Sequence, residues 1–241
     1  MKYRLNKLKI LHYLFKAVIL LLIGHVFAIF LRLKTSGLEE KIPRLIIKLF
    51  DFNLETNLPT YFSSLVLLIN GFLLMIIGSA HKKTNKKFYY WYGLAVVFCF
   101  LSLDEMVQIH EQLNAPMGAI LKTKGILYFS WFIPYIIIMI IMGIAYFKFM
   151  MRLPKDVLKL FILAGVLFVS GAVGMEALSG MHAEIHGFDN ITYYIMYTIE
   201  ELLEMSGAIV FLYALLHYIT KEFKNFEVMF KPKTKKTLKE A

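Results

Sequence analysis

Long apolar runs recur along the whole chain, and they restrict it to one class of fold. A helix needs about 20 mainly apolar residues to cross the hydrocarbon core of a bilayer. Runs of that length predict membrane-spanning helices at 11–32, 60–80, 88–110, 127–149, 157–180 and 191–218. The sequence therefore predicts an all-α integral membrane helical bundle with about six transmembrane helices.

Composition leaves no room for a large soluble domain beside these helices. Hydrophobic residues make up 59% of the 241 residues, whereas a soluble domain usually has 45–50%. We expect residues 1–220 to form a single transmembrane helical domain and residues 221–241 to form a basic, flexible cytoplasmic tail. The lone Cys99 excludes an intrachain disulfide.

The net charge of +10 does not come from one compact basic domain, so we predict no nucleic-acid binding. Lys and Arg cluster in the amino-terminal flank, in "HKKTNKK", around Lys148–Lys155 and in the tail. Such clusters are typical of cytoplasmic loops beside anionic lipid. With an even number of spans, the pattern predicts a chain embedded in a lipid bilayer with both termini cytoplasmic.

Two segments depart from the simple pattern of spans and short loops. The stretch "LEEKIPRLIIKLFDF", within residues 34–55, is amphipathic and predicts a helix on the outer membrane surface between the first two spans. Pro134 in "SWFIPYIIIM" is expected to kink the fourth span.

The sixth span carries three acids, Glu200, Glu201 and Glu204, that have no basic neighbour in the sequence. Carboxylates inside a bilayer are costly and mark functional sites or polar contacts between helices. At about 100° per residue, Glu200 and Glu204 share one narrow helix face with Tyr193 and Tyr197, and Glu201 lies at its edge.

The third span ends in a second acidic face at a similar depth. In "FLSLDEMVQIHEQL", Asp104, Gln108 and Glu111 fall on one side of a regular helix and Glu105 lies close to them. His110 lies roughly 120° away from this stripe. It joins the acids only if the helix unwinds at this point.

The fifth span contributes an acid and two histidines. Glu176 shares a face with small residues, which let helices approach closely in lipid. His182 and His186, in "HAEIH", are four residues apart, the spacing of helical metal ligands. The small residues of this face are Gly165, Ala172, Ser179, Gly180 and Ala183, and Gly207 and Ala208 of the sixth span could meet them.

We expect these three spans to face one another around a polar site that opens to the outside. Carboxylates with imidazoles suit Zn, Fe or Mn, and a lipid-like substrate would reach the site from the outer leaflet. No Glu-x-x-His pair is present, which disfavours a ferritin-like centre. The predicted metal ligands are His110, Glu176, His182, His186, Glu200, Glu201 and Glu204, and the predicted catalytic acids are Asp104, Glu105 and Glu111.

Three functions remain open from the residues alone. The first is a metal-dependent enzyme, a hydrolase in the simplest case, that acts on a lipid or lipid-linked substrate. The second is a proton- or cation-coupled transporter, although the sequence has no inverted repeat. The third is a non-catalytic membrane subunit or sensor whose carboxylates are structural.

Three segments resemble an uncharacterised bacterial family of multi-pass inner-membrane proteins. They are "LFDFNLETNLPTYFSSLVLL", "FLSLDEMVQIHEQL" and "YTIEELLEMSGAIVFLYALL", which carry its Pro-Thr-aromatic-x-Ser, Leu-Asp-Glu…Ile-His-Glu and Glu-Glu-x-x-Glu motifs. The resemblance covers most of the chain and implies a bacterial cytoplasmic (inner) membrane. It also adds Glu55 and Pro59 to the residues of interest, and it implies no particular reaction.

The chain is also faintly similar to membrane hydrolases related to alkaline ceramidases, which bind zinc through histidines that include an HxxxH pair. His182 and His186 match that pair, and Asp104 matches the acid. No third histidine that matches the pattern is evident within a span, and the glutamates of the sixth span are foreign to that pattern.

Overall fold

The computed structural model describes residues 6–34, 41–84 and 86–223, and these residues form helices and no strand. Six helices in this part of the chain are long and apolar enough to cross a membrane, which confirms the all-α multi-pass fold. They are α1 (Lys7–Lys34), α3 (Leu58–Lys83), α4 (Tyr89–Val107), α6 (Phe132–Met150), a continuous helix at Lys155–His186, and α9 (Ile191–Glu222).

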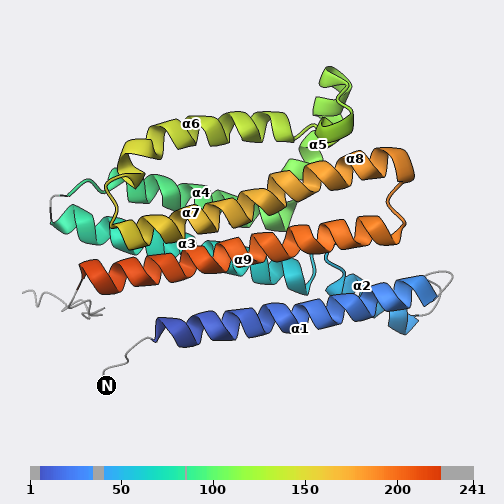
Figure 1. Cartoon of the computed structure of the whole chain (residues 1–241), viewed down its shortest axis with the longest axis horizontal. Helices are drawn as coiled ribbons and strands as arrows, with labels where there is room; N and C mark the ends of the chain where they lie inside the picture. Colours follow the sequence, from blue (N-terminus) through green and yellow to red (C-terminus); the bar gives the residue numbers. More distant parts are fainter. Residues whose placement is uncertain (1–5, 35–40, 85, 224–241) are drawn as a thin grey trace, which may run out of the picture.

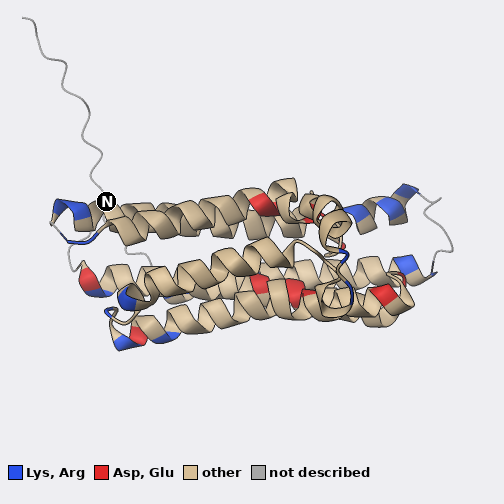
Figure 2. Cartoon of the chain, turned by 90° about the horizontal axis from the view of Figure 1, so that it is seen from above, with Lys and Arg blue, Asp and Glu red and all other residues tan. Residues whose placement is uncertain are grey.

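The six long helices lie side by side along the long axis of the molecule (Figure 1). The beginning of α1 and the end of α9 lie at the same end of the bundle, here called the terminal end. The opposite end, here called the loop end, carries the short helix α5 (Ile109–Leu121) and the α8–α9 connection. Basic residues gather at both ends, whereas acids also lie part-way along the bundle (Figure 2). Which side of a membrane each end faces stays a prediction.

The sixth span, α9, is the helix around which the others pack. It contacts α1, α3 and the fifth span, and Ala214 and Leu215 are fully buried among them. Asn70 of α3 donates to the backbone carbonyl of Ala208 at 2.9 Å, so a polar side chain links two spans inside the core. At Gly207, an added Cβ would lie 2.7 Å from the backbone nitrogen of Phe168. The expected close approach of small residues is therefore present.

The fifth span contains an irregular turn in its middle. It consists of α7 (Lys155–Val169), a π-helical turn η2 (Ser170–Met175) and α8 (Glu176–His186). The turn brings Gly171, and not the expected Gly165, against α9. An added Cβ at Gly171 would lie 2.6 Å from the carbonyl oxygen of Glu200, whereas one at Gly165 would meet nothing within 4 Å.

Two details of the predicted spans are wrong. The third span does not continue to residue 110, because α4 ends at Val107 and Gln108 takes a left-handed conformation with φ of 60°. Pro134 does not kink the fourth span. It lies in the first turn of α6, where its missing N–H would have no helical partner.

The expected amphipathic helix is present as α2 (Lys41–Phe50), between the first two spans. Ile47 is buried, and the ring of Phe50 lies against Gly24 of α1. Residues 35–40, before α2, lie outside the described residues. Most of the predicted basic tail, residues 224–241, lies outside them too, and α9 continues through residues 221 and 222.

Candidate functional site

A buried polar network at the loop end fixes the segment between α2 and α3. The carboxylate of Asp51 is fully buried. Its Oδ2 lies 2.8 Å from Arg32 Nη2 of α1, and its Oδ1 accepts a hydrogen bond from the Tyr197 hydroxyl of α9 at 3.0 Å. His25 stacks on Phe52 with ring centroids 4.2 Å apart. The sequence around "DFNLETN" is therefore tied to two spans at once.

The same segment presents Glu55 to the bundle interior. Asn57 caps α3 by accepting from the Thr60 backbone N–H at 3.1 Å, and its amide donates to the Asp51 carbonyl at 2.7 Å. Between them, Thr56 takes a left-handed conformation with φ of 59°. This conformation is costly for a β-branched residue. The surrounding contacts therefore hold a strained turn directly beside Glu55.

The break between α4 and α5 brings His110 to the acids. Because Gln108 is left-handed, the backbone N–H of His110 turns back and donates to Asp104 Oδ1 at 2.9 Å. The imidazole Nδ1 lies 3.4 Å from Asp104 Oδ2, which also accepts a hydrogen bond from the Tyr135 hydroxyl at 3.0 Å. This is the unwinding that His110 needed in order to join the acidic face.

The fifth and sixth spans supply the other wall. Glu176, the first residue of α8, accepts a hydrogen bond from the Trp131 indole N–H at 3.0 Å. Ser179 donates to Glu200 at 3.4 Å. Because Gly171 has no side chain, α9 approaches the π-helical turn at Glu200 and Glu204. The irregular turn thus sets both the position of Glu176 and the distance between the two helices.

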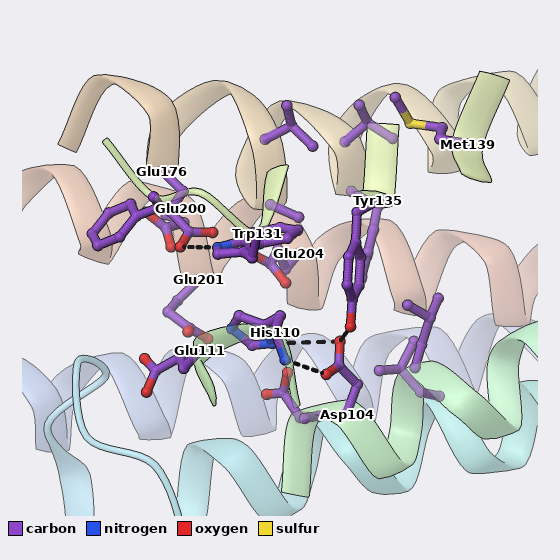
Figure 3. A pocket seen from close by; sticks show the side chains of 18 of the residues that line it. Asp104, His110, Glu111, Trp131, Tyr135, Met139, Glu176, Glu200, Glu201 and Glu204 are labelled. Atoms are coloured by element: carbon purple, nitrogen blue, oxygen red, sulfur yellow. Dashed lines mark hydrogen bonds and ion pairs between the residues drawn. The ribbon is translucent and has the colours of Figure 1, made fainter. Parts of the chain in front are cut away.

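These elements enclose a cavity of about 810 Å³. The labelled acids and His110 point into a common space, with Trp131 and Tyr135 beside them (Figure 3). Part of the lining is apolar and comes from α4, α6 and α7. Among the described residues, the lining includes no Lys or Arg. It does include eight carboxylates and one imidazole: Glu55, Asp104, Glu105, His110, Glu111, Glu176, Glu200, Glu201 and Glu204.

One group in the described chain has the geometry of a metal site. Glu55, His110 and Glu111 each offer one ligand atom, and these atoms all lie within 4.8 Å of one another. His110 Nε2 lies 4.0 Å from Glu55 Oε1, while Nδ1 of the same ring faces Asp104. A histidine that contacts a carboxylate through one nitrogen and faces the ligand position with the other is common in metal centres.

The titration of two members of this group is shifted. Burial and then the neighbouring charge of Glu111 raise the pKa of Glu55 to about 8. Burial alone would lower the pKa of His110, but its hydrogen bond to Asp104 and the charges of Glu176, Asp104 and Glu55 outweigh it and raise the pKa to about 9. Near neutral pH and without a metal, Glu55 and His110 are therefore both mainly protonated.

The structure brings eight of the ten predicted site residues to this cavity. They are Asp104, Glu105, His110, Glu111, Glu176, Glu200, Glu201 and Glu204. His182 and His186 do not line it. Their rings stack on each other with centroids 4.5 Å apart, and His182 Nε2 lies 2.9 Å from the side-chain oxygen of Asn190, the residue that caps α9. In this structure the HxxxH pair belongs to the α8–α9 corner.

Sequence reasoning overlooked three side chains that shape the site. Glu55 entered only through the family resemblance, because it lies in a loop and has no periodic pattern. Tyr135 and Trp131 look like ordinary aromatic residues at the edge of a span. Only their contacts with Asp104 and Glu176 show that they are part of the site. No pattern in the sequence signals these contacts.

Comparisons with known proteins give a family and no reaction. No curated protein and no solved structure matches the chain significantly. The family model described as a domain of unknown function, DUF8692, matches residues 13–219. This range includes all six candidate spans in whole or in large part, and every acid of the cavity. The chain is therefore a multi-pass membrane protein that belongs to the DUF8692 family.

Proposed function

We propose that the loop-end cavity is the metal-dependent active site of a membrane enzyme that hydrolyses a lipid or lipid-linked substrate. The observation that carries this proposal is the charge of the cavity. Eight carboxylates and one imidazole line it, with no Lys or Arg among the described lining residues. An ionised acid at the centre of a spanning helix costs at least about 2.5 kcal/mol, so cations or protons have to offset these charges.

The group around His110 favours a metal ion over protons alone. Glu55, His110 and Glu111 provide three donors within 4.8 Å of one another, and two carboxylates with one imidazole suit Zn, Fe or Mn. Asp104 would hold the His110 ring through Nδ1 and leave Nε2 for the metal. Tyr135 in turn fixes Asp104. The supporting contacts of a metal ligand are therefore in place.

The remaining carboxylates could then accept and donate protons during hydrolysis. A metal ion would lower the pKa of a bound water and polarise the bond to be cleaved. The water oxygen would add to the ester or amide carbon, and its proton would pass to a nearby carboxylate, for which Glu176, Glu200 and Glu201 are the candidates. That carboxylate would return the proton to the leaving oxygen or nitrogen.

Metal analysis of the detergent-purified protein is the decisive experiment. We expect near-stoichiometric zinc, iron or manganese in the wild type, and loss of the metal in Glu111→Gln and in the double variant Glu55→Gln/Glu111→Gln. Glu222→Gln is the matched control, because Glu222 pairs with Lys86 at the terminal end, far from the cavity in sequence and structure. A folded wild-type protein that stays metal-free after growth in added metals would refute the proposal and favour a structural role for the acids.

The reaction is tested separately, once a metal is found. Metal-loaded protein in proteoliposomes made from a bacterial lipid extract should release a free acyl chain, measured by mass spectrometry over time. Glu200→Gln should abolish the release and Glu222→Gln should not. Metal binding without any such turnover would support the metal site and refute the proposed hydrolysis.

Ion-coupled transport is the second candidate, and the two irregular turns favour it. Transporters place ion sites where spans are broken, and here the left-handed Gln108 and the π-helical turn η2 both flank the acids. Transport predicts a cation or proton flux across proteoliposomes that depends on Glu200 or Glu204. The enzyme predicts no such flux and access to the cavity from one side only.

A further inference from the structure

The acidic cavity continues into an apolar trough between α4, α6 and α7. Phe100 of α4, Met139 and Met142 of α6, and Phe168 of α7 line the first part of it. A second cavity of about 230 Å³ follows, lined by Tyr146, Met150, Phe161, Phe211 and others. Leu67, Leu94, Leu101, Phe168 and Val169 line both cavities, so the two adjoin each other. The whole feature is here called the trough.

The trough is open on its side, and a contact between two tyrosines lies near its far end. Val96 and Ile138 line it and are nevertheless 67% and 58% exposed, so its wall opens to the surroundings of the bundle. In a chain of six spans these surroundings are the hydrocarbon of the bilayer. At the terminal end, the Tyr146 hydroxyl donates to the carbonyl of Tyr90, and the two rings lie 5.5 Å apart. The side is therefore the open approach.

The length of the trough suits an alkyl chain. From Tyr135, beside the acids, to Met150 at the far end, α6 rises by about 22 Å. Half of the hydrocarbon core measures about 15 Å. The trough therefore exceeds the depth of one leaflet, and it can hold a whole long chain whose polar head stays at the carboxylates.

The chemistry of the far part disfavours polar occupants. Tyr146 carries the one polar side chain of its described lining, and its hydroxyl is already paired. A polar group or water would find no partner there. An alkyl chain needs no such partner.

We propose that the trough binds one alkyl chain of a membrane lipid, which enters sideways from the bilayer and places its head group at the acidic cavity. This inference rests on the proposed function, because it says where the alkyl chain of the proposed lipid substrate binds while its head group lies at the acids. Binding of the chain itself needs no metal and no turnover.

Gly165 offers a direct test. It lines the far part of the trough, and an added Cβ would meet nothing within 4 Å, so a side chain can be introduced there and Gly165→Leu is expected to fill part of the trough. Gly143→Leu is the matched control. Gly143 is an exposed helical glycine of α6, it also has nothing within 4 Å, and it lines neither cavity. Both variants add the same side chain in a spanning helix.

The probes are two alcohols with a photoreactive diazirine at the chain terminus, one derived from octadecanol and one from octanol. After irradiation of the protein in nanodiscs, peptide mass spectrometry should locate the long probe at Tyr146, Phe161 and Phe211. Gly165→Leu, or Gly165→Val if the leucine variant is unstable, should lower that labelling about tenfold, a loss of about 1.4 kcal/mol of binding free energy. Gly143→Leu should leave the labelling unchanged, and the octanol probe should be insensitive to all three variants.

Labelling of the outer face of α6, at Ile140 and Ile144, with no effect of Gly165→Leu would overturn the inference. The wild-type protein treated with a chelator should label as the untreated protein does. If the trough is labelled while the wild type binds no metal, binding of the alkyl chain is supported and the metal-dependent enzyme is refuted. If metal binds and the trough stays unlabelled, the metal site is supported and binding of the alkyl chain in the trough is refuted.

Discussion

Replacing Gly171 by alanine should separate two helices at the acidic cavity. The added Cβ would lie 2.6 Å from the carbonyl oxygen of Glu200, 2.8 Å from Cγ of Glu204 and 3.2 Å from the Glu204 backbone nitrogen. Two of these three atoms belong to the backbone, which cannot rotate away as a flexible side chain would. To reach ordinary contact at 3.4 Å, α9 has to retreat by about 0.8 Å.

The expected loss follows from comparison with Gly165→Ala in the same span. Alanine is a better helix former than glycine by about 1 kcal/mol, and this gain applies to both variants. Overpacking in a close contact costs about 1–3 kcal/mol, and it applies to Gly171 alone, since Gly165 faces open space. We therefore expect Gly171→Ala to be less stable than Gly165→Ala by about 1–3 kcal/mol.

Reversible unfolding of both variants by SDS in mixed micelles measures this difference, and metal content measures its consequence for the site. Gly207→Ala should behave like Gly171→Ala in stability, because its Cβ would lie 2.7 Å from the backbone of Phe168. It lies outside the acidic cavity and should retain more metal. Equal stability of the Gly171 and Gly165 variants would show that α9 yields freely and that the reasoning is wrong.

Three further outcomes are expected. Asp51→Ala should destabilise the protein by about 1.5–3 kcal/mol, because it leaves a buried charged network unpaired, whereas Glu222→Ala, at an exposed pair, should cost under about 1 kcal/mol in the same SDS titration. Gln108→Gly should fold at least as well as the wild type, because glycine accepts the left-handed conformation. Gln108→Val should be less stable than Gln108→Gly by about 1–2 kcal/mol, and equal unfolding midpoints for the two variants would contradict the assigned conformation. In the presence of a chelator, the free energy of unfolding should fall as pH rises, because the raised pKa values of Glu55 and His110 mean that folding favours the protonated form of both groups. The contribution of Glu55 is lost between about pH 4.5 and pH 8, and that of His110 between about pH 6.5 and pH 9. Glu55→Gln should flatten the first part of this pH profile, and a metal-loaded protein should show the opposite slope, because metal ligands have to be deprotonated.

The spans and the acids of α9 could be predicted because both follow regular periods. An apolar run of about 20 residues specifies a spanning helix almost regardless of its neighbours. Tyr193, Tyr197, Glu200 and Glu204 do share one side of α9 and line one cavity, as the helical period requires. Regular geometry is the part of the fold that local sequence determines.

The rest of the site depends on departures from that geometry. His110 reaches Asp104 because Gln108 breaks the helix, and nothing in "DEMVQIHEQ" requires a break there. His182 and His186 have metal-ligand spacing, yet the side-chain oxygen of Asn190 lies beside His182. Glu55 lies in a turn that is held by the contacts of Asp51 with Arg32 of α1 and Tyr197 of α9. Such contacts between distant segments are outside the reach of a pattern in one stretch of sequence.

The π-helical turn makes the site sensitive to chain length as well as to residue identity. A π turn inside an α-helix corresponds to one additional residue. If residues 170–175 wound as a regular helix with no residue removed, everything beyond them would rotate by about 100° relative to α7. Glu176 would then leave the cavity while every acid stayed in the sequence. Removal of one residue together with the π turn would instead leave Glu176 near its present orientation. An alignment of the family should therefore be examined at this turn for gaps before its acids are compared.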